Sequence, residues 1–157
     1  MPLLGKILIC AIGTIVLGSL GGIATASSID GWYETLQTPP GRPPNWVFGP
    51  VWTLLYAAMG AAVALVWHRV PSGTPKRHAL VLFAIQFLLN MAWSPVFFAL
   101  QQIGLALAVI VTLWVAIILT IRRFLPLDRT AAFLLTPYLL WVSYATYLNA
   151  GFLILNR

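Results

Sequence analysis

The chain has 157 residues, of which 61% are hydrophobic and only 8% are charged, and its mean hydropathy is +0.92. A soluble domain carries about 25% charged residues, so this composition excludes an ordinary soluble globular protein. The net charge of +6 does not indicate a nucleic-acid-binding protein, because the Lys and Arg residues lie in short clusters between apolar runs and form no continuous face.

Five apolar stretches follow one another along the chain. A membrane-spanning helix needs about 20 predominantly apolar residues, and each stretch is close to that length with no charged residue in its interior. None shows the period-two alternation of a strand. The sequence therefore predicts an all-α membrane protein, a single domain folded as a five-transmembrane-helix bundle. Its helices are expected at about 7–27, 46–67, 79–100, 103–121 and 131–155.

The first stretch has a second interpretation. Lys6, the apolar run and Ala24-Thr25-Ala26 resemble a signal peptide with an A-x-A cleavage site. The run exceeds the roughly 7–15 residues of a signal-peptide core, which favours a retained helix. Gly18 and Gly22 give this helix a small-xxx-small pattern, which predicts close helix packing, either inside the bundle or in a dimer.

The connection at residues 28–45 is long and rich in proline. Proline fixes φ and lacks a backbone donor, so we expect a stiff, non-helical outer loop here, whereas the later connections are short. Three further prolines, Pro50, Pro95 and Pro137, fall inside predicted helices. We expect them to kink these helices, which would either open a cavity or only shape the bundle.

Charge predicts the orientation. If the loops after the second and fourth helices are cytoplasmic, seven basic residues lie inside and two, Arg42 and Arg157, lie outside. This agrees with the positive-inside rule. The N-terminus is then cytoplasmic, and the C-terminus and first loop lie on the opposite side. The seven inside residues are Lys6, Arg69, Lys76, Arg77, Arg122, Arg123 and Arg129.

Three helices each place aromatic and polar residues on one face. Polar side chains in a bilayer face protein or a cavity, so we expect these faces to converge on an aromatic interior pocket for a flat ligand. The alternative is that the amides only form interhelical hydrogen bonds. The faces consist of Trp52 and Tyr56; Gln86, Asn90, Trp93 and Phe97; and Tyr138, Trp141, Ala145 and Asn149.

The sequence offers no pattern typical of a catalytic or metal site. His68 and His78 lie near basic residues at helix ends, where solvated side chains are expected. No Cys/His cluster, nucleophilic triad or Gly-rich phosphate loop is present. We therefore predict no catalytic residues, no metal ligands and no required cofactor.

Three blocks of sequence resemble the translocator protein family, also called the tryptophan-rich sensory proteins. The similarity extends over nearly the whole chain, with matching spacing. The blocks are Pro43-Pro44-Asn45-Trp46-Val47-Phe48-Gly49-Pro50-Val51-Trp52-Thr53-Leu54-Leu55-Tyr56, Gln86-x-x-x-Asn90-x-x-Trp93-x-Pro95-x-Phe97-Phe98, and Pro137-Tyr138-Leu139-x-Trp141-x-x-x-Ala145-Thr146-x-Leu148-Asn149.

The resemblance implies a five-helix bundle that binds porphyrins such as protoporphyrin IX or haem, benzodiazepine-type drugs and, in animal members, sterols. It also implies a homodimer, with the lipid bilayer as the other partner. Tyr33 and Trp46 are implied near a lid formed by the first loop. The residues implied to line the cavity are Trp52, Asn90, Trp93, Trp141 and Ala145.

Two positions depart from the family pattern. Gly41 stands where the first loop of the family usually has Trp, which removes an aromatic from the lid. Ala150 follows Asn149 where the sterol motif of animal members has Tyr, which argues against cholesterol recognition of that kind.

The sequence leaves three functional hypotheses. The first is a receptor or carrier with a role in tetrapyrrole sensing or transport. The second is an enzyme that degrades protoporphyrin IX oxidatively, with Trp52 and Trp141 as candidate redox residues. The third is a transporter. The lack of an acid–base pair and of a metal site favours binding over catalysis.

Overall fold

The computed structural model describes every residue from 1 to 157, and it is all-helical. Five long helices are apolar enough to cross a bilayer, which confirms the predicted five-transmembrane-helix bundle of an integral, multi-pass membrane protein. The long helices are α1 (Leu3–Ser28), α3 (Phe48–Arg69), α4 (Thr74–Ser94), α5 (Ile103–Phe124) and α7 (Thr136–Leu155). The short elements are α2 (Trp32–Thr35), η1 (Asn45–Val47), η2 (Pro95–Ala99) and α6 (Arg129–Leu134).

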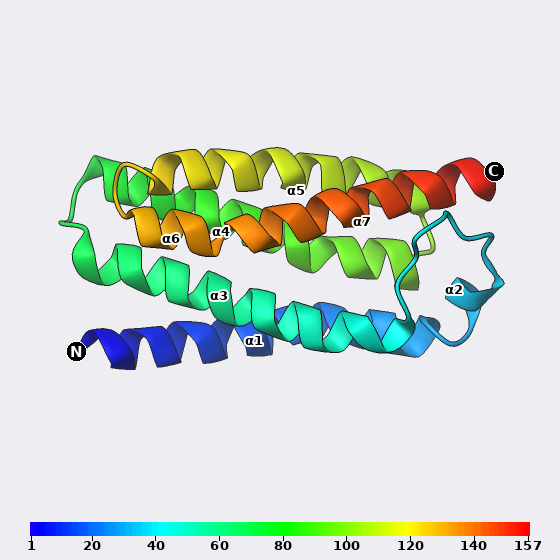
Figure 1. Ribbon diagram of the computed structural model, residues 1–157, viewed down its shortest axis with the longest axis horizontal. Coiled ribbons are helices and arrows are strands. Elements are labelled where there is room, and N and C mark those ends of the chain that lie inside the picture. The colour runs from blue at the N-terminus through cyan, green and yellow to red at the C-terminus, as the bar shows by residue number, and fades with distance from the viewer.

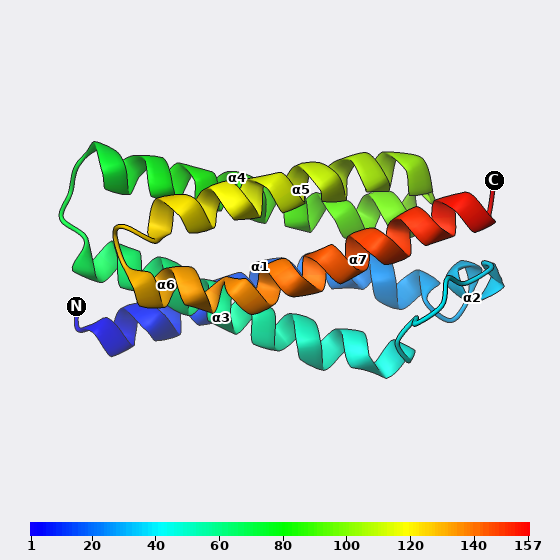
Figure 2. The ribbon, with the colours of Figure 1, turned by 45° about the horizontal axis from the view of Figure 1, so that its top comes forward.

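The long helices run along a common axis, with the two chain termini at opposite ends (Figure 1). Helix α1 packs on α3, and α5 packs on both α4 and α7. The view turned by 45° shows the first loop with α2 at the same end as the C-terminus (Figure 2). The first loop thus covers one end of the bundle, and the turns after α3 and α5 lie at the other.

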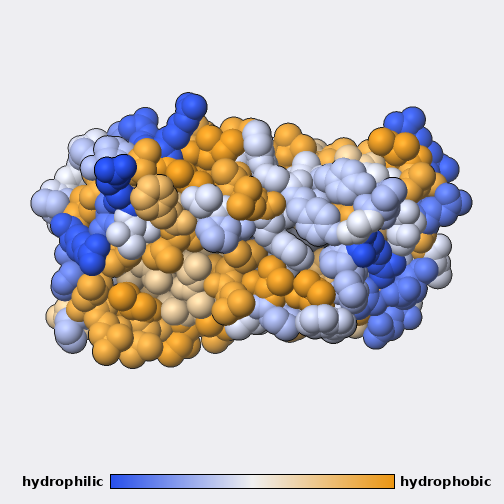
Figure 3. Space-filling model, in the orientation of Figure 1, coloured by the Kyte–Doolittle hydropathy of each residue, from blue (hydrophilic) through white to orange (hydrophobic).

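The outer surface of the long helices is apolar. Only 17% of the most apolar window of α1 is buried inside the bundle, and Leu8, Ile12 and Leu20 on it are exposed. Hydrophobic residues cover much of the side of the molecule between two more hydrophilic ends (Figure 3). A bilayer is the solvent that such a surface requires.

Helix α1 approaches α3 closely where Gly18 of α1 packs against Tyr56 of α3. A Cβ added to Gly18 would lie 2.3 Å from Cζ of Tyr56, and the Thr14 hydroxyl donates to the Tyr56 carbonyl at 2.7 Å. At Gly22, by contrast, an added Cβ would meet nothing within 4 Å. The small-residue stripe therefore packs inside the bundle at Gly18.

The three helix prolines behave differently from one another. Pro50 lies in the first turn of α3 and Pro137 is the second residue of α7. The kink predicted at Pro50 is wrong, because the first turn of a helix has no partner for its N–H groups and tolerates proline. At Pro137 the predicted fifth helix is interrupted as expected, since α6 ends at Leu134 and α7 begins at Thr136. Pro95 does distort its helix: α4 ends at Ser94, and η2 continues it as a π-helix.

Two boundaries differ from the prediction. The third long helix, α4, begins at Thr74 and not near 79. The charged residues after Thr74 are unfavourable in hydrocarbon, but they fit the exposed first turns of a helix that extends beyond it. The first loop is not entirely non-helical, since α2 forms one turn at Trp32–Thr35.

The end opposite the first loop is held by charged residues. The Asp128 carboxylate accepts from the Ala131 N–H at 2.9 Å and so caps α6, and it pairs with Arg69 at 3.1 Å. The Lys76 ammonium donates to the carbonyls of Trp67 and Val70 at the end of α3. Most basic residues lie at this end, and its cytoplasmic orientation stays a prediction.

Candidate ligand-binding site

A cavity of about 370 Å³ lies in the half of the bundle nearer the first loop. Its walls come from the C-terminal half of α1, the N-terminal half of α3, the α4–η2 junction and α7. No charged side chain lines it. The lining residues are Gly18, Ser19, Gly21, Gly22, Thr25, Ala26, Ile29, Tyr33, Asn45, Phe48, Gly49, Trp52, Thr53, Tyr56, Asn90, Trp93, Ser94, Phe97, Phe98, Trp141, Ala145, Leu148, Asn149 and Phe152.

The floor of the cavity is polar. The Tyr56 hydroxyl donates to Oδ1 of Asn90 at 2.8 Å, and Nδ2 of Asn90 donates to the Tyr138 hydroxyl at 2.9 Å. The Tyr138 hydroxyl donates in turn to Oε1 of Gln86 at 2.8 Å. These hydrogen bonds join α3, α4 and α7 below the cavity, which fixes the position of the two members that line it, Tyr56 and Asn90.

The walls are aromatic. Trp52 stacks on Tyr56, with ring centroids 5.5 Å apart. On the opposite side, Nε1 of Trp93 donates to Oδ1 of Asn149 at 2.9 Å, and Nδ2 of Asn149 donates to the Ile103 carbonyl at 3.0 Å. The amide oxygen of Asn149 therefore holds the Trp93 indole, and its amide nitrogen bonds the start of α5. Flat faces held this way suit a flat ligand.

Tyr33, from the first loop, closes the cavity at the loop end. Its side chain is buried among Phe97, Phe98 and Phe152, with ring centroids 5.2–6.2 Å away. The Arg42 guanidinium lies 4.2 Å above the ring. Burial raises the pKa of Tyr33 to about 12, partly opposed by Arg42, so the phenol stays neutral at physiological pH.

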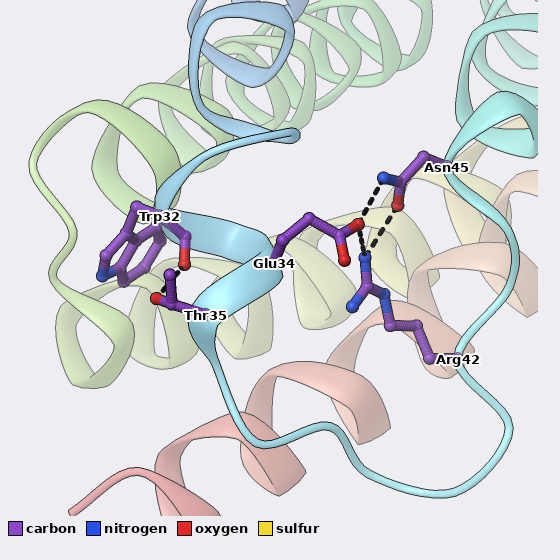
Figure 4. Close-up of polar contacts among 5 residues, drawn as sticks. All are labelled: Trp32, Glu34, Thr35, Arg42 and Asn45. Carbon is purple, nitrogen blue, oxygen red and sulfur yellow. Dashed lines mark hydrogen bonds and ion pairs between the residues drawn. The ribbon is translucent and has the colours of Figure 1, made fainter.

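A cluster of three polar residues holds the two arms of the first loop together. The Arg42 guanidinium donates to Oε1 of Glu34 at 2.8 Å and to Oδ1 of Asn45 at 2.8 Å, and Nδ2 of Asn45 donates to the same Glu34 oxygen at 2.6 Å (Figure 4). Hydrogen bonds from Asn45 and Arg42, together with the Arg42 charge, lower the pKa of Glu34. The cluster therefore favours the ionised form of the Glu34 carboxyl.

The same loop is fastened to α7. The hydroxyls of Tyr144 and Tyr147 donate to the carbonyls of Gly41 and Pro40, the second at 2.8 Å. The Asn156 side chain accepts from the Gln37 N–H at 2.8 Å and donates to its carbonyl at 2.9 Å. These contacts hold the loop over the end of the cavity.

Gly41 has a φ of +85°, in the left-handed region that favours glycine. A tryptophan at this position, as in the family pattern, would strain the backbone in its present conformation. The Gly41 carbonyl also forms one of the contacts of the loop to α7.

The cavity has an open side between α1 and α3. Small residues of both helices line it there and are exposed on the surface that the bilayer covers. The exposed lining residues are Ser19, Gly22, Ala26, Gly49 and Thr53.

The structure brings most of the residues singled out from the sequence together around the cavity. These are Tyr33, Trp52, Tyr56, Asn90, Trp93, Phe97, Trp141, Ala145 and Asn149. Three others lie elsewhere. The Trp46 side chain is 74% exposed, because η1 turns it away from the bundle, whereas Gln86 and Tyr138 are fully buried behind the floor. That the cavity residues bind a ligand stays a prediction.

Sequence reasoning missed several parts of the lining, among them the small residues of α1 and the start of α3. The small residues of α1 were interpreted as helix-packing positions only, although the same absence of side chains at Gly22 opens the cavity. Asn45 and Phe48 were also missed as lining residues, because they precede the apolar face of α3. Their position directly after the proline-rich loop was the available signal.

Comparison of the sequence with known proteins finds relatives over nearly the whole chain. A sequence model of the TspO/MBR family matches residues 8–155. The chain is 42% identical over 145 residues to the tryptophan-rich protein TspO of Chlorobaculum tepidum, covering 90% of each chain. It is 38% identical to the tryptophan-rich sensory protein of Cereibacter sphaeroides, covering 89% of this chain and 88% of the relative. It is 39% identical to the human translocator protein, covering 88% of this chain and 85% of the relative.

Proposed function

This chain belongs to the TspO/MBR family, a membership that supports a membrane receptor or transporter role, and we propose that its cavity binds porphyrins, such as protoporphyrin IX or haem, and benzodiazepine-type drugs. The role would be tetrapyrrole sensing or transport. The observation that carries the proposal is an uncharged cavity with aromatic walls and a small polar floor, formed between helices of a membrane bundle.

Size and polarity support a flat, largely apolar ligand. A volume of about 370 Å³ lies in the range of sites that enclose drug-sized molecules. A porphyrin is larger, and the open side between α1 and α3 would let its outer edge extend toward the lipid. The tryptophan faces supply apolar contact, and Tyr56 and Asn90 supply hydrogen bonds to a polar edge.

Quenching of tryptophan fluorescence by protoporphyrin IX tests the proposal on the protein in detergent. Trp141→Ala should weaken binding, because Trp141 lines the cavity. Trp114→Ala is the matched control: Trp114 lies on α5, outside the cavity lining, and bonds the Ser143 hydroxyl at 2.8 Å. An unchanged affinity in Trp141→Ala would refute this use of the cavity.

Carrier activity requires a separate measurement. Sealed vesicles that take up protoporphyrin only when they contain the protein would support transport, whereas saturable binding without uptake would support a receptor. Both outcomes are compatible with the cavity described above, and they separate the two roles.

The oxidative alternative has one structural feature in its favour. Trp52 has an indole side chain that can lose an electron to an oxidant. It lies on the cavity wall and stacks on Tyr56. Illumination of bound protoporphyrin in the presence of oxygen tests it. New absorbing products that disappear in Trp52→Phe would support an enzyme, and their absence from the wild type would exclude it.

A further inference from the structure

A continuous chain of hydrogen-bonded side chains leads from the cavity floor into the core. In order from the cavity it consists of Tyr56, Asn90, Tyr138 and Gln86, and we refer to these four residues as the relay. Tyr56 and Asn90 line the cavity, whereas Tyr138 and Gln86 are 0% exposed and do not reach it. At the far end, Nε2 of Gln86 is buried without any hydrogen-bond partner.

In the arrangement described, each of the three hydrogen bonds between members of the relay is donated away from the cavity. Tyr56 donates to Asn90, Asn90 donates to Tyr138, and Tyr138 donates to Gln86. The Tyr56 oxygen then has a free lone pair but no free proton, so the floor accepts a hydrogen bond from a ligand at this atom. It cannot donate one there.

The same four side chains permit the opposite direction if the oxygen and nitrogen atoms of the two amides exchange places. The amide groups of Asn90 and Gln86 have nearly the same shape after a 180° turn, and a phenol hydroxyl donates to either side. After reversal, Gln86 donates to Tyr138, Tyr138 to Asn90, and Asn90 to Tyr56. The Tyr56 proton becomes free, and the floor donates to a ligand.

The unpartnered end of the relay makes the two directions differ in free energy, because each leaves a different Gln86 group unpaired. In the first direction a buried Gln86 NH₂ group has no partner, and in the reversed direction its carbonyl oxygen has none. An unpaired buried N–H is rarer in proteins, and thus costlier, than an under-satisfied carbonyl. The direction in which the bonds are donated away from the cavity therefore carries a free-energy penalty. A ligand that bonds Tyr56 can offset or increase this penalty.

We propose that the relay is reversible, and that Gln86, which touches no ligand, determines whether the cavity floor prefers ligands with hydrogen-bond acceptors or ligands with donors. The proposal rests on the proposed function only in that the cavity binds a small molecule. Gln86 is a positioning residue that acts through Tyr138, Asn90 and Tyr56. A ligand carbonyl selects the donating floor, and a ligand N–H selects the accepting floor.

Removal of the Gln86 amide makes the two directions unequal in a defined way. In Gln86→Leu the Tyr138 hydroxyl loses its only acceptor on that side. To avoid an unpaired buried hydroxyl it must donate to Asn90, which then donates to Tyr56. The variant is thereby held with its floor donating. It should keep carbonyl ligands and lose affinity for N–H ligands.

Two flat tricyclic probes of nearly equal size isolate this effect. Carbazole has an N–H donor and no strong acceptor, and 9-fluorenone has a carbonyl acceptor and no donor. We expect the ratio of carbazole affinity to fluorenone affinity to fall about fivefold in Gln86→Leu, the effect of one neutral hydrogen bond. The infrared carbonyl stretch of bound fluorenone should move to lower frequency than in lipid, in the wild type and in the variant.

Two further variants keep the test independent of folding defects. Thr120→Val removes another fully buried polar side chain, which bonds only its own helix at Ala116, and should leave the affinity ratio unchanged. Tyr138→Phe cuts the relay one residue nearer the cavity. It leaves Asn90 bonded only to Tyr56, so the affinity ratio should shift in the same direction. If Gln86→Leu does not fold, Tyr138→Phe provides the test in its place.

An unchanged ratio in the folded variants, an equal loss for both probes, or an absence of tricyclic binding by the wild type would overturn the relay proposal. The proposed function fails separately. Wild-type protein that binds the two tricyclic probes with the expected ratio shift, but does not bind protoporphyrin, would sustain the relay and reject the porphyrin ligand.

Discussion

The backbone of Ala11 in α1 lies directly against Gly60 in α3: a Cβ on Gly60 would come within 2.4 Å of the Ala11 Cα atom. Such a distance leaves no space for a methyl group, and the obstacle is backbone, which cannot rotate away. The close contact of α1 with α3 at this point therefore depends on glycine, as expected where helices pack in a membrane.

Gly60→Ala should lower the thermal unfolding midpoint in detergent and destabilise the bundle by about 1–3 kcal/mol, the usual cost of overpacking. Gly13→Ala is the control on the partner helix, since a Cβ there meets nothing within 4 Å. It should be neutral or slightly stabilising because alanine favours the helix. Equal midpoints for the two variants would contradict this packing.

Gly22→Leu should block the open side of the cavity without disturbing the bundle. Gly22 lines the cavity, and an added Cβ meets no atom within 4 Å. We expect slower ligand association, or weaker binding, at an unchanged unfolding midpoint. Gly13→Leu places the same side chain in equally open space outside the cavity lining, and it should bind like the wild type. If both variants bind equally well, ligands do not use this side.

Asn156→Ala should loosen the first loop. The variant loses both hydrogen bonds to Gln37, while the contacts of Tyr144 and Tyr147 to the loop remain. Each lost bond corresponds to about 1 kcal/mol, so we expect ligand dissociation to accelerate several-fold in stopped-flow fluorescence. Thr112→Val, which removes a hydroxyl bonded only within α5, should leave the rate unchanged. No acceleration in Asn156→Ala would show that the loop does not retain the ligand.

Acid should weaken the hold of the loop through Glu34. The pKa of this carboxyl is lower in the folded loop than in an unfolded chain, because Asn45 and Arg42 bond the ionised form. Its contribution is therefore complete above the ordinary carboxyl pKa of about 4.3 and is lost as the pH falls through the lowered value. Ligand dissociation should accelerate in that acid window.

Glu34→Gln provides the control for this pH dependence, since glutamine keeps the shape of the side chain and has no charge to lose. The variant should dissociate faster than the wild type at neutral pH and respond less to acid. A variant that kept the full acid response would show that another group is responsible.

Ala145→Thr should weaken binding of protoporphyrin and of flat probes. Ala145 is 9% exposed and lines the cavity, so two additional heavy atoms would reduce the space against the aromatic walls. Ala150→Thr makes the same change further along α7, outside the cavity lining, and should bind normally. An equal affinity in titrations of the two variants would argue against a ligand beside Ala145.

The sequence alone determined the membrane fold and most of the cavity wall. Apolar runs of spanning length with uncharged interiors are enough to specify five helices, because a bilayer requires helical backbone and apolar exterior. Helical spacing then placed residues such as Asn90 and Trp93 on one face. That face was predicted to point into the bundle, because an amide side chain is unfavourable in contact with lipid.

Only the tertiary structure decided which polar residues reach the cavity and how it is closed. Gln86 and Asn90 share one helical face, yet Gln86 lies one turn deeper, where Tyr138 from α7 separates it from the cavity. The loop contacts between Gln37 and Asn156 join positions 119 residues apart. Side chains from different helices meet through packing, which periodicity along a single helix does not describe.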